Sequence, residues 1–227
     1  GAGFAVAFNA PIAGALFVFE GLLKRFEARL VIAALAASAV AIWVGRAILG
    51  NTPEFTAPPL TAPGLDQVPF FAVLGIAAGL AGTLYNRTLL ATLRMTDRFP
   101  GLRVEWRAAI VGAAVGAIAW CAPWLVGGGD GLAQQALRGE GSLVVLPALF
   151  FVRLGLIACS VGAGAPGGLL VPFLALGAEL GLWLGLLCAL ALPGLAVEPA
   201  GFAVVGMAAL FTAIVRAPVT AMVLVTE

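Results

Sequence analysis

The stretch GAGAPGGLLVPFLALG, residues 162–177, is rich in glycine and proline inside an otherwise apolar sequence. Its first half is a poor helix former, because its glycines lose much backbone freedom in a helix and Pro166 adds a break. Pro172 lies where the first turn of a helix tolerates proline, and an apolar run continues from there to Leu192. The stretch therefore predicts an irregular loop that leads into a buried helix. The glycines in question are Gly162, Gly164, Gly167 and Gly168.

The start of that helix carries backbone N–H groups that have no partner within the helix. At Leu169, Leu170 and Val171 they are free to face a cavity, where the helix dipole favours negative charge. Within a membrane, bare backbone is tolerated only where protein buries it or where it lines a cavity. The stretch thus predicts a membrane protein that binds an anion through backbone amides.

Composition supports a membrane environment. Of the 227 residues, 62% are hydrophobic and 10% are charged, and the mean hydropathy is +1.10. Soluble domains carry about 25% charged residues. We therefore expect an all-α polytopic membrane protein.

Several function classes are disfavoured by the same composition. A net charge of +1 without a basic stripe argues against nucleic acid, and the lack of histidine removes the commonest metal ligand and general base. The cysteines Cys121, Cys159 and Cys188 lie far apart in apolar segments and suggest neither a zinc site nor disulfides. We expect no metal, no cofactor and no enzymatic activity, since no paired acids or nucleophile–base set appears.

Apolar runs and their breaks give a series of expected helices. Short or broken helices among them suggest a transporter with internal repeats.

Basic clusters at Lys24–Arg29 and Arg94–Arg103 flank an acidic loop at 51–66, so the clusters are expected on the cytoplasmic side. Glycines at Gly14, Gly75, Gly79, Gly82, Gly112 and Gly116 are expected to allow close helix packing. The expected helices cover 12–21, 30–49, 68–93, 108–125, 130–138, 143–161, 172–192, 200–214 and 219–227.

Two distant segments resemble each other. Residues 8–20 read FNAPIAGALFVFE and residues 215–227 read VRAPVTAMVLVTE. Ala-Pro and the closing glutamate coincide when the two are aligned. The similarity favours two halves of a duplicated fold over chance likeness between apolar stretches.

Taken together, these stretches resemble the CLC family of chloride channels and chloride/proton antiporters. Residues 162–177 are similar to its Ser-Gly-Ala-Pro-Gly-Gly-x-Phe-x-Pro segment, and residues 8–20 to its Phe-Asn-Ala-Pro-Leu-Ala-Gly helix. Residues 216–227 are similar to its Arg-Ala-Pro-Leu-Thr segment, and Gly127–Gly129 lie between them in the same order. The resemblance covers essentially the whole chain.

The resemblance implies a CLC-type inverted-repeat fold and a homodimer whose subunits each conduct chloride or another small anion across the lipid bilayer. Residues 1–227 would form one partial transmembrane domain, comprising the end of the first half and most of the second. Starting at Gly1 rather than Met, the sequence is expected to be a fragment. A multi-pass protein of the cell membrane is implied, and the composition suggests a bacterial inner membrane. The anion-binding positions would be Gly168, Leu169, Leu170, Val171 and Pro172.

Departures from the family pattern affect the expected mechanism. Leu170 replaces the usual phenylalanine, which leaves the backbone donors in place. The segments that carry the family's gating glutamate and coordinating tyrosine are not in this sequence, and Tyr85 lies in another segment. Gly21 stands where antiporters have the proton-relay glutamate. We therefore expect a channel-like or uncoupled pathway, or an antiporter in which Glu20 or Glu27 takes the relay role.

Three charged residues allow alternative interpretations. Glu20 is either a proton carrier or, as we favour, a structural acid paired with Lys24 one turn on. Arg153 either shapes the potential felt by the anion or forms an interhelical pair, and Glu179 either faces a vestibule or pairs with Arg153. A nitrate- or fluoride-selective variant also remains open. A membrane scaffold is the remaining functional class, and it leaves the buried glycine-rich loop unexplained.

Overall fold

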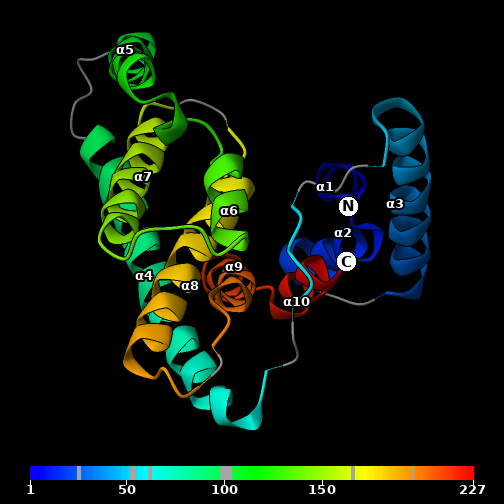
Figure 1. Ribbon diagram of the computed structural model, residues 1–227. Helices are drawn as coiled ribbons and strands as arrows, with labels where there is room; N and C mark the ends of the chain where they lie inside the picture. The colour runs from blue at the N-terminus through cyan, green and yellow to red at the C-terminus, as the bar shows by residue number, and fades with distance from the viewer. Residues whose placement is uncertain (25–26, 52–54, 61–62, 98–103, 165–166, 196) are drawn as a thin grey trace.

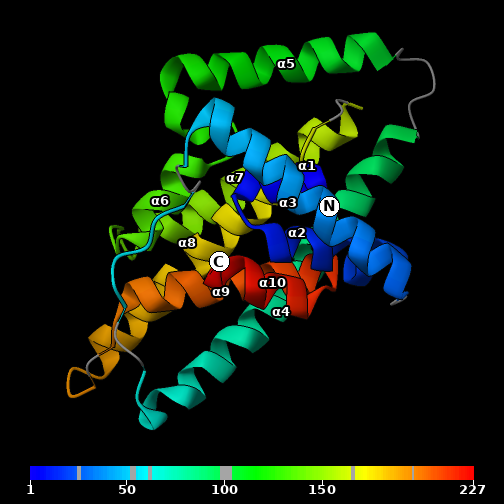
Figure 2. The same cartoon turned by 90° about the vertical axis from the view of Figure 1, so that its right-hand side faces the viewer.

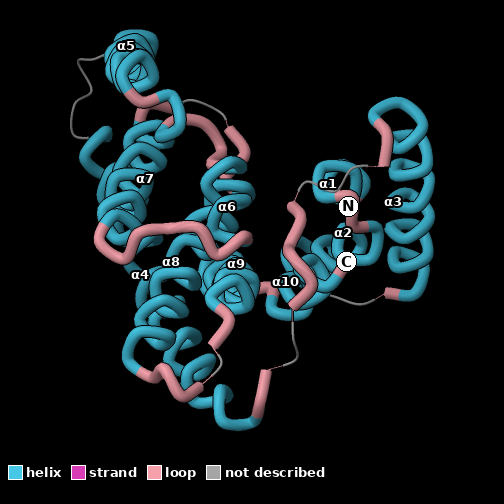
Figure 3. Tube along the Cα trace, in the orientation of Figure 1, coloured by secondary structure: helices cyan, strands magenta, loops and turns pink. Residues whose placement is uncertain are grey.

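A computed structural model describes residues 1–24, 27–51, 55–60, 63–97, 104–164, 167–195 and 197–227 (Figure 1). Within these residues the chain is built from helices and loops, and no strand is present (Figure 3). Several expectations lie outside the described residues: the break at Pro166, and the placement of Arg25, Arg98 and Arg103.

The expected helices are confirmed, with ends shifted by a few residues. Gly162 proves to be the last helical residue of its helix rather than part of the loop, and the second short helix continues as a π-helix. The elements are α1 (Ala2–Phe8), α2 (Pro11–Phe17), the π-helix η1 (Val18–Leu23), α3 (Ala28–Leu49), the 3₁₀ helix η2 (Leu65–Gln67), α4 (Val68–Asp97), α5 (Val104–Cys121), the 3₁₀ helix η3 (Pro123–Leu125), α6 (Asp130–Leu137), α7 (Val145–Gly162), α8 (Leu170–Ala191), α9 (Pro199–Val215) and α10 (Pro218–Thr226).

The helices gather in two groups. α1, α2, α3 and α10 lie together on one side, and α4, α6, α7, α8 and α9 lie on the other (Figure 1). α10 belongs to the first group in space although it follows α9 directly in sequence. α5 crosses one end of the second group, as the quarter-turn view shows (Figure 2).

Four helices are long and apolar enough to cross a membrane within the described residues. They cover Ala28–Ile48, Leu65–Thr96, Val145–Gly162 and Leu170–Ala191. α8 is the most deeply packed of the four, with 56% of its apolar window buried inside the protein, against 11% for α3. The buried helix predicted after the glycine-rich loop is therefore the central element of the second group.

Glycines allow α8 and α9 to pack backbone to backbone. A Cβ added at Gly177 would lie 2.6 Å from the carbonyl oxygen of Gly206, and one at Gly206 would lie 2.8 Å from Cα of Gly181. Gly185 likewise lies against Pro199 of α9. Gly177, Gly181 and Gly185 are four residues apart along α8 and therefore lie on one face of the helix. This arrangement is typical of close membrane helix pairs. α8 is thereby fixed against α9 along two turns.

The glycines expected to mediate packing do so only in part. Gly14 lies against Ala5, and Gly82 lies against Ala213, each too close for a Cβ. The expectation was wrong for Gly75, Gly79, Gly112 and Gly116, which have open space around them. These four lie on helix faces that contact no neighbour in the described part of the chain, so small size alone did not predict the contact face.

The two similar segments adopt the same backbone. Asn9 ends α1 with φ 53°, and Arg216 ends α9 with φ 62°; both values are left-handed. In each copy a buried alanine with extended φ follows, and a helix then starts at proline. The duplicated motif predicted from residues 8–20 and 215–227 is therefore also a structural repeat.

Candidate functional site

The N-terminus of α8 forms where predicted. Leu169 is its N-cap residue, Leu170 is its first helical residue, and no side chain caps it. Pro172 in the first turn has no N–H to offer, and the amide of Phe173 donates to the carbonyl of Leu169 at 3.2 Å. The amides of Leu170 and Val171 are thus the first-turn donors left without a helical partner.

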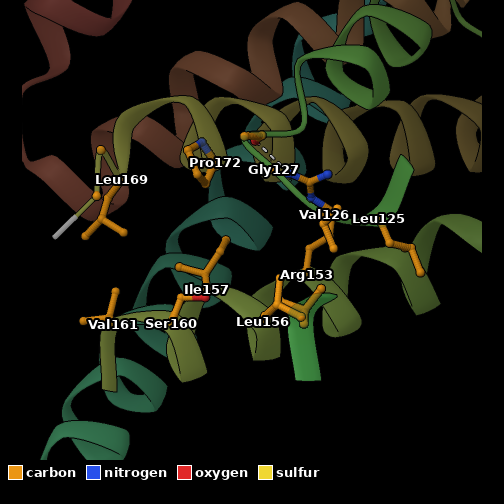
Figure 4. Close-up of a pocket in the computed structure, with 14 residues that line it drawn as sticks. Leu125, Val126, Gly127, Arg153, Leu156, Ile157, Ser160, Val161, Leu169 and Pro172 are labelled. Atoms are coloured by element: carbon orange, nitrogen blue, oxygen red, sulfur yellow. Dashed lines mark hydrogen bonds between the residues drawn. The ribbon is translucent and has the colours of Figure 1, made fainter. Parts of the chain in front are cut away.

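A cavity of about 260 Å³ lies beside this helix start (Figure 4). One wall is a stripe of α7 with Arg153, Ile157 and Ser160, spaced as one helical face. The opposite wall includes Gly167, Gly168, Leu169 and Pro172, and Gly127 and Gly128 close one end. The cavity is mostly apolar, with one cationic side chain and a helix N-terminus on its boundary, an arrangement that favours a small anion.

Arg153 forms a buried ion pair with Glu179 of α8. The guanidinium Nε lies 3.7 Å from the carboxylate Oε1, and both side chains are about 98–99% buried. Arg153 Nη2 also donates to the carbonyl of Gly128 at 2.7 Å. The pairing expected as one alternative is therefore observed. Removing one partner of such a pair typically costs about 3–5 kcal/mol, because the other charge stays buried.

The pair leaves hydrogen-bonding capacity unused. Within the described residues, Arg153 Nε and Nη1 and both oxygens of Glu179 have no hydrogen-bond partner. Because Arg153 also lines the cavity, its charge acts there as well as on Glu179. Arg153 is thus observed as an interhelical ion-pair partner that also lines the cavity, whereas an effect of its charge on an anion stays a prediction.

The predicted anion-binding residues divide between two sides of the helix start. Gly168, Leu169 and Pro172 line the cavity, whereas Leu170 and Val171 do not. Leu170 packs against both hydrophobic cores, and Val171 faces Gly128. The five residues are consecutive in the chain. The amides without a helical partner lie at the N-terminal end of α8 rather than on one wall of the cavity.

Tyr85 lies closer to this region than the sequence suggested. Its ring packs edge-on against Phe173 in the first turn of α8, with 5.0 Å between ring centroids. The side chain is 3% exposed, and its hydroxyl has no hydrogen-bond partner among the described residues. It does not line the cavity. No local sequence signal could have placed it there, because α4 and α8 are far apart in the chain.

Glu20 does not form the expected pair with Lys24. Its carboxylate instead accepts hydrogen bonds at the N-terminus of α10, from the amide of Val219 at 2.9 Å and from Thr220. The expected pairing with Lys24 was wrong, because an exposed i,i+4 pair contributes about 0.5 kcal/mol, less than several charge-assisted hydrogen bonds.

Gly21, the substituted relay position, lies in η1, which continues α2 as a π-helix. Wide π turns occur often at functional sites. A Cβ at Gly21 would lie 3.1 Å from the ring edge of Phe17, so a larger side chain fits once that ring shifts slightly.

Residues 1–227 match the family model described as "Voltage gated chloride channel". The chain is 37% identical over 233 residues to the H(+)/Cl(-) exchange transporter ClcA of Vibrio parahaemolyticus, covering 99% of this chain and 49% of that protein. It is 36% identical over 239 residues to ClcA of Yersinia pestis, covering 100% of this chain and 48% of that protein. The chain thus spans about half the length of the curated relatives that it matches.

Two solved structures have a fold similar to that of this chain. A slow cyanobacterial Cl⁻/H⁺ antiporter superposes with a TM-score of 0.91 at 31% identity, over 98% of this chain and 53% of that one. A CLC-type fluoride/proton antiporter superposes with a TM-score of 0.76 at 22% identity, over 96% and 54%, and shares the fold. With its apolar helices and a family match over its full length, the chain is a multi-pass membrane protein that belongs to the voltage-gated chloride channel family, the CLC family.

Proposed function

We propose that this chain forms part of a pathway for chloride or a related small anion across the membrane. The observation that carries the proposal is the uncapped N-terminus of α8, which shares its cavity with the buried cation Arg153. Backbone donors and a partly neutralised arginine bind an anion without holding it permanently. Conduction needs this balance between entry and release. The related ClcA proteins are named exchange transporters, which supports chloride as the anion.

Within this function we propose that the pathway is channel-like or only loosely coupled to protons. Gly21 has no side chain that could carry a proton, and Glu20 is held by three hydrogen bonds at α10. The alternative is proton-coupled antiport through another acid such as Glu27, favoured by the names of the relatives. A fluoride- or nitrate-transporting variant is the further alternative, and the fluoride/proton antiporter with the same fold supports considering it.

The wider proposal includes a homodimer in a bacterial cell membrane and a transport role rather than an enzymatic one. Within the described residues no group of three or more acidic, cysteine or histidine side chains is placed to hold a metal. We propose that the anion is held at the start of α8, where Gly168, Leu169 and Pro172 line the cavity and the amides of Leu170 and Val171 lie at the helix end.

The test is anion flux with simultaneous pH recording, on the protein at its full natural length in liposomes under a chloride gradient. We expect chloride flux with little or no accompanying proton movement. Proton movement in a fixed ratio to chloride would establish the antiport alternative. A protein that moves no anion of any kind would contradict the proposal as a whole.

A further inference from the structure

The side chain of Glu20 occupies the N-terminus of α10 as a bound anion would. Its carboxylate accepts hydrogen bonds from the amide of Val219 at 2.9 Å, the amide of Thr220 at 2.6 Å and the Thr220 hydroxyl at 2.8 Å. Thr220 is fully buried, whereas Glu20 is partly exposed and Val219 is exposed, so the contact lies at the edge of the protein interior. Glu20 and its partners are about 200 residues apart in the chain.

Glu227 makes the same contact in the opposite direction. Its carboxylate accepts hydrogen bonds from the amide of Ile12 at 3.0 and 3.1 Å and from the amide of Ala13 at 2.9 Å, at the start of α2. Glu227 therefore binds the two residues that follow Pro11, and Glu20 binds the two residues that follow Pro218.

The positions of the two glutamates show how the copies are related. Each one follows the proline of its own helix by the same number of residues, at the far end of that helix. A carboxylate at the end of one helix reaches the start of the other only if the helices run antiparallel. Figure 2 shows α2 and α10 side by side, and contacts between them agree. The repeat is thus inverted, and the two contacts are exchanged by its pseudo-twofold axis.

We propose that Glu20 and Glu227 are internal anions that lock the two inverted copies together, and that Glu20 is a fixed positioning residue rather than a proton carrier. Helix N-termini attract negative charge, and here two of them are satisfied by the protein's own carboxylates. At the N-terminus of α8, the side chain of the N-cap residue Leu169 is apolar and makes no capping hydrogen bond. Because the protein's own carboxylates fill α2 and α10, these two helix starts are not offered to a transported anion, whereas the start of α8 lies beside the cavity.

The proton part rests on the transport function proposed above. A carboxylate can accept hydrogen bonds at both oxygens, whereas its protonated form must donate one. Around Glu20, the two amides can only donate, and the Thr220 hydroxyl already donates to the carboxylate. Protonation would remove the charge that strengthens these hydrogen bonds and turn one accepting oxygen into a donor, which weakens the contact between the two repeats. Glu20 is therefore held in the ionised form by the geometry of α10.

The test compares thermal unfolding of detergent-solubilised variants of the protein at its full natural length. Glu20→Ala should lower the Tm by about 2–8 °C, as expected for the loss of a helix cap. Thr220→Val, which removes one of the three donors, should lower it by less. The matched control is Glu27→Ala, an exposed glutamate at the N-cap position of α3 whose side chain makes no capping hydrogen bond, and it should leave the Tm unchanged.

The effect of formate on the Tm distinguishes the loss of a bound carboxylate from a general loss of structure. Formate should raise the Tm of Glu20→Ala more than that of the native protein or Glu27→Ala, because a free carboxylate can fill the vacated N-terminus. A Tm that stays at the native value, or a lowered Tm without formate rescue, would overturn the internal-anion role.

In the flux assay, Glu20→Gln should leave the ratio of protons to chloride unchanged. Loss of proton movement with a native Tm would make Glu20 the carrier and overturn the proposal, whereas absence of all anion flux with the expected Tm changes would refute only the transport function.

Discussion

Gly181→Ala will destabilise the protein more than other single methyl additions in its helices. The added Cβ would overlap the carbonyl oxygen of Phe202 and lie 2.9 Å from Cα of Ala203. These are backbone atoms of α9, so relief requires the two helices to separate along their whole contact. We expect a loss of about 3 kcal/mol, the upper part of the range for overpacking, and a Tm lowered by about 6–12 °C. Thermal unfolding in detergent measures the change.

The control for this prediction is Gly201→Ala, which adds the same methyl group to α9 where nothing lies within 4 Å. It should change the Tm by no more than about 2 °C, since alanine is also the better helix former. If both variants unfold at the same temperature, α8 and α9 are not packed backbone to backbone. The proposed anion site would then lie on a helix that is free to shift.

Gly21→Glu will introduce proton movement into the proposed anion pathway, which we expect to conduct chloride with little or no proton movement in the native protein. The position lies one residue beyond Glu20 on η1, and the side chain fits if the ring of Phe17 moves by a few tenths of an ångström. A carboxylate there can take up and release protons without breaking the Glu20–α10 contact. We expect the ratio of protons to chloride to rise from near zero to a fixed measurable value in liposome flux with pH recording.

Gly21→Gln is the matched control, since it adds nearly the same volume without a titratable group. It should conduct chloride at a similar rate and move no protons. If Gly21→Glu behaves like Gly21→Gln, the identity of residue 21 does not determine coupling in this protein. If the native protein already moves protons in a fixed ratio, another acid performs the relay.

The features that local physical chemistry decides were predictable from the sequence. Glycines and Pro166 before an apolar run, with Pro172 in the first turn, predicted the start of α8 to within a residue or two. The likeness of residues 8–20 and 215–227 predicted a repeat that the structure shows to be inverted. Two later helices start at a proline, α9 at Pro199 and α10 at Pro218.

Contacts between distant segments were not predictable in the same way. Local spacing suggested Lys24 as the partner of Glu20, whereas the observed partner lies 200 residues away at a helix N-terminus. The glycines of α4 and α5 had the right spacing for packing, but the helix face that meets a neighbour depends on the arrangement of the whole fold. Tyr85 reached Phe173 for the same reason.

Chloride affinity after conversion of the Val171 amide to an ester tests the central claim most directly. An α-hydroxy acid at position 171 removes one N–H donor at the start of α8 and keeps the side chain. A hydrogen bond to a charged group contributes about 1.5–3 kcal/mol, so we predict at least about 10-fold weaker chloride binding by titration calorimetry. The same replacement at Ala200, in the first turn of α9, should leave the affinity unchanged. Equal affinities for the native protein and the ester at position 171 would contradict the proposal that the N-terminus of α8 holds the anion.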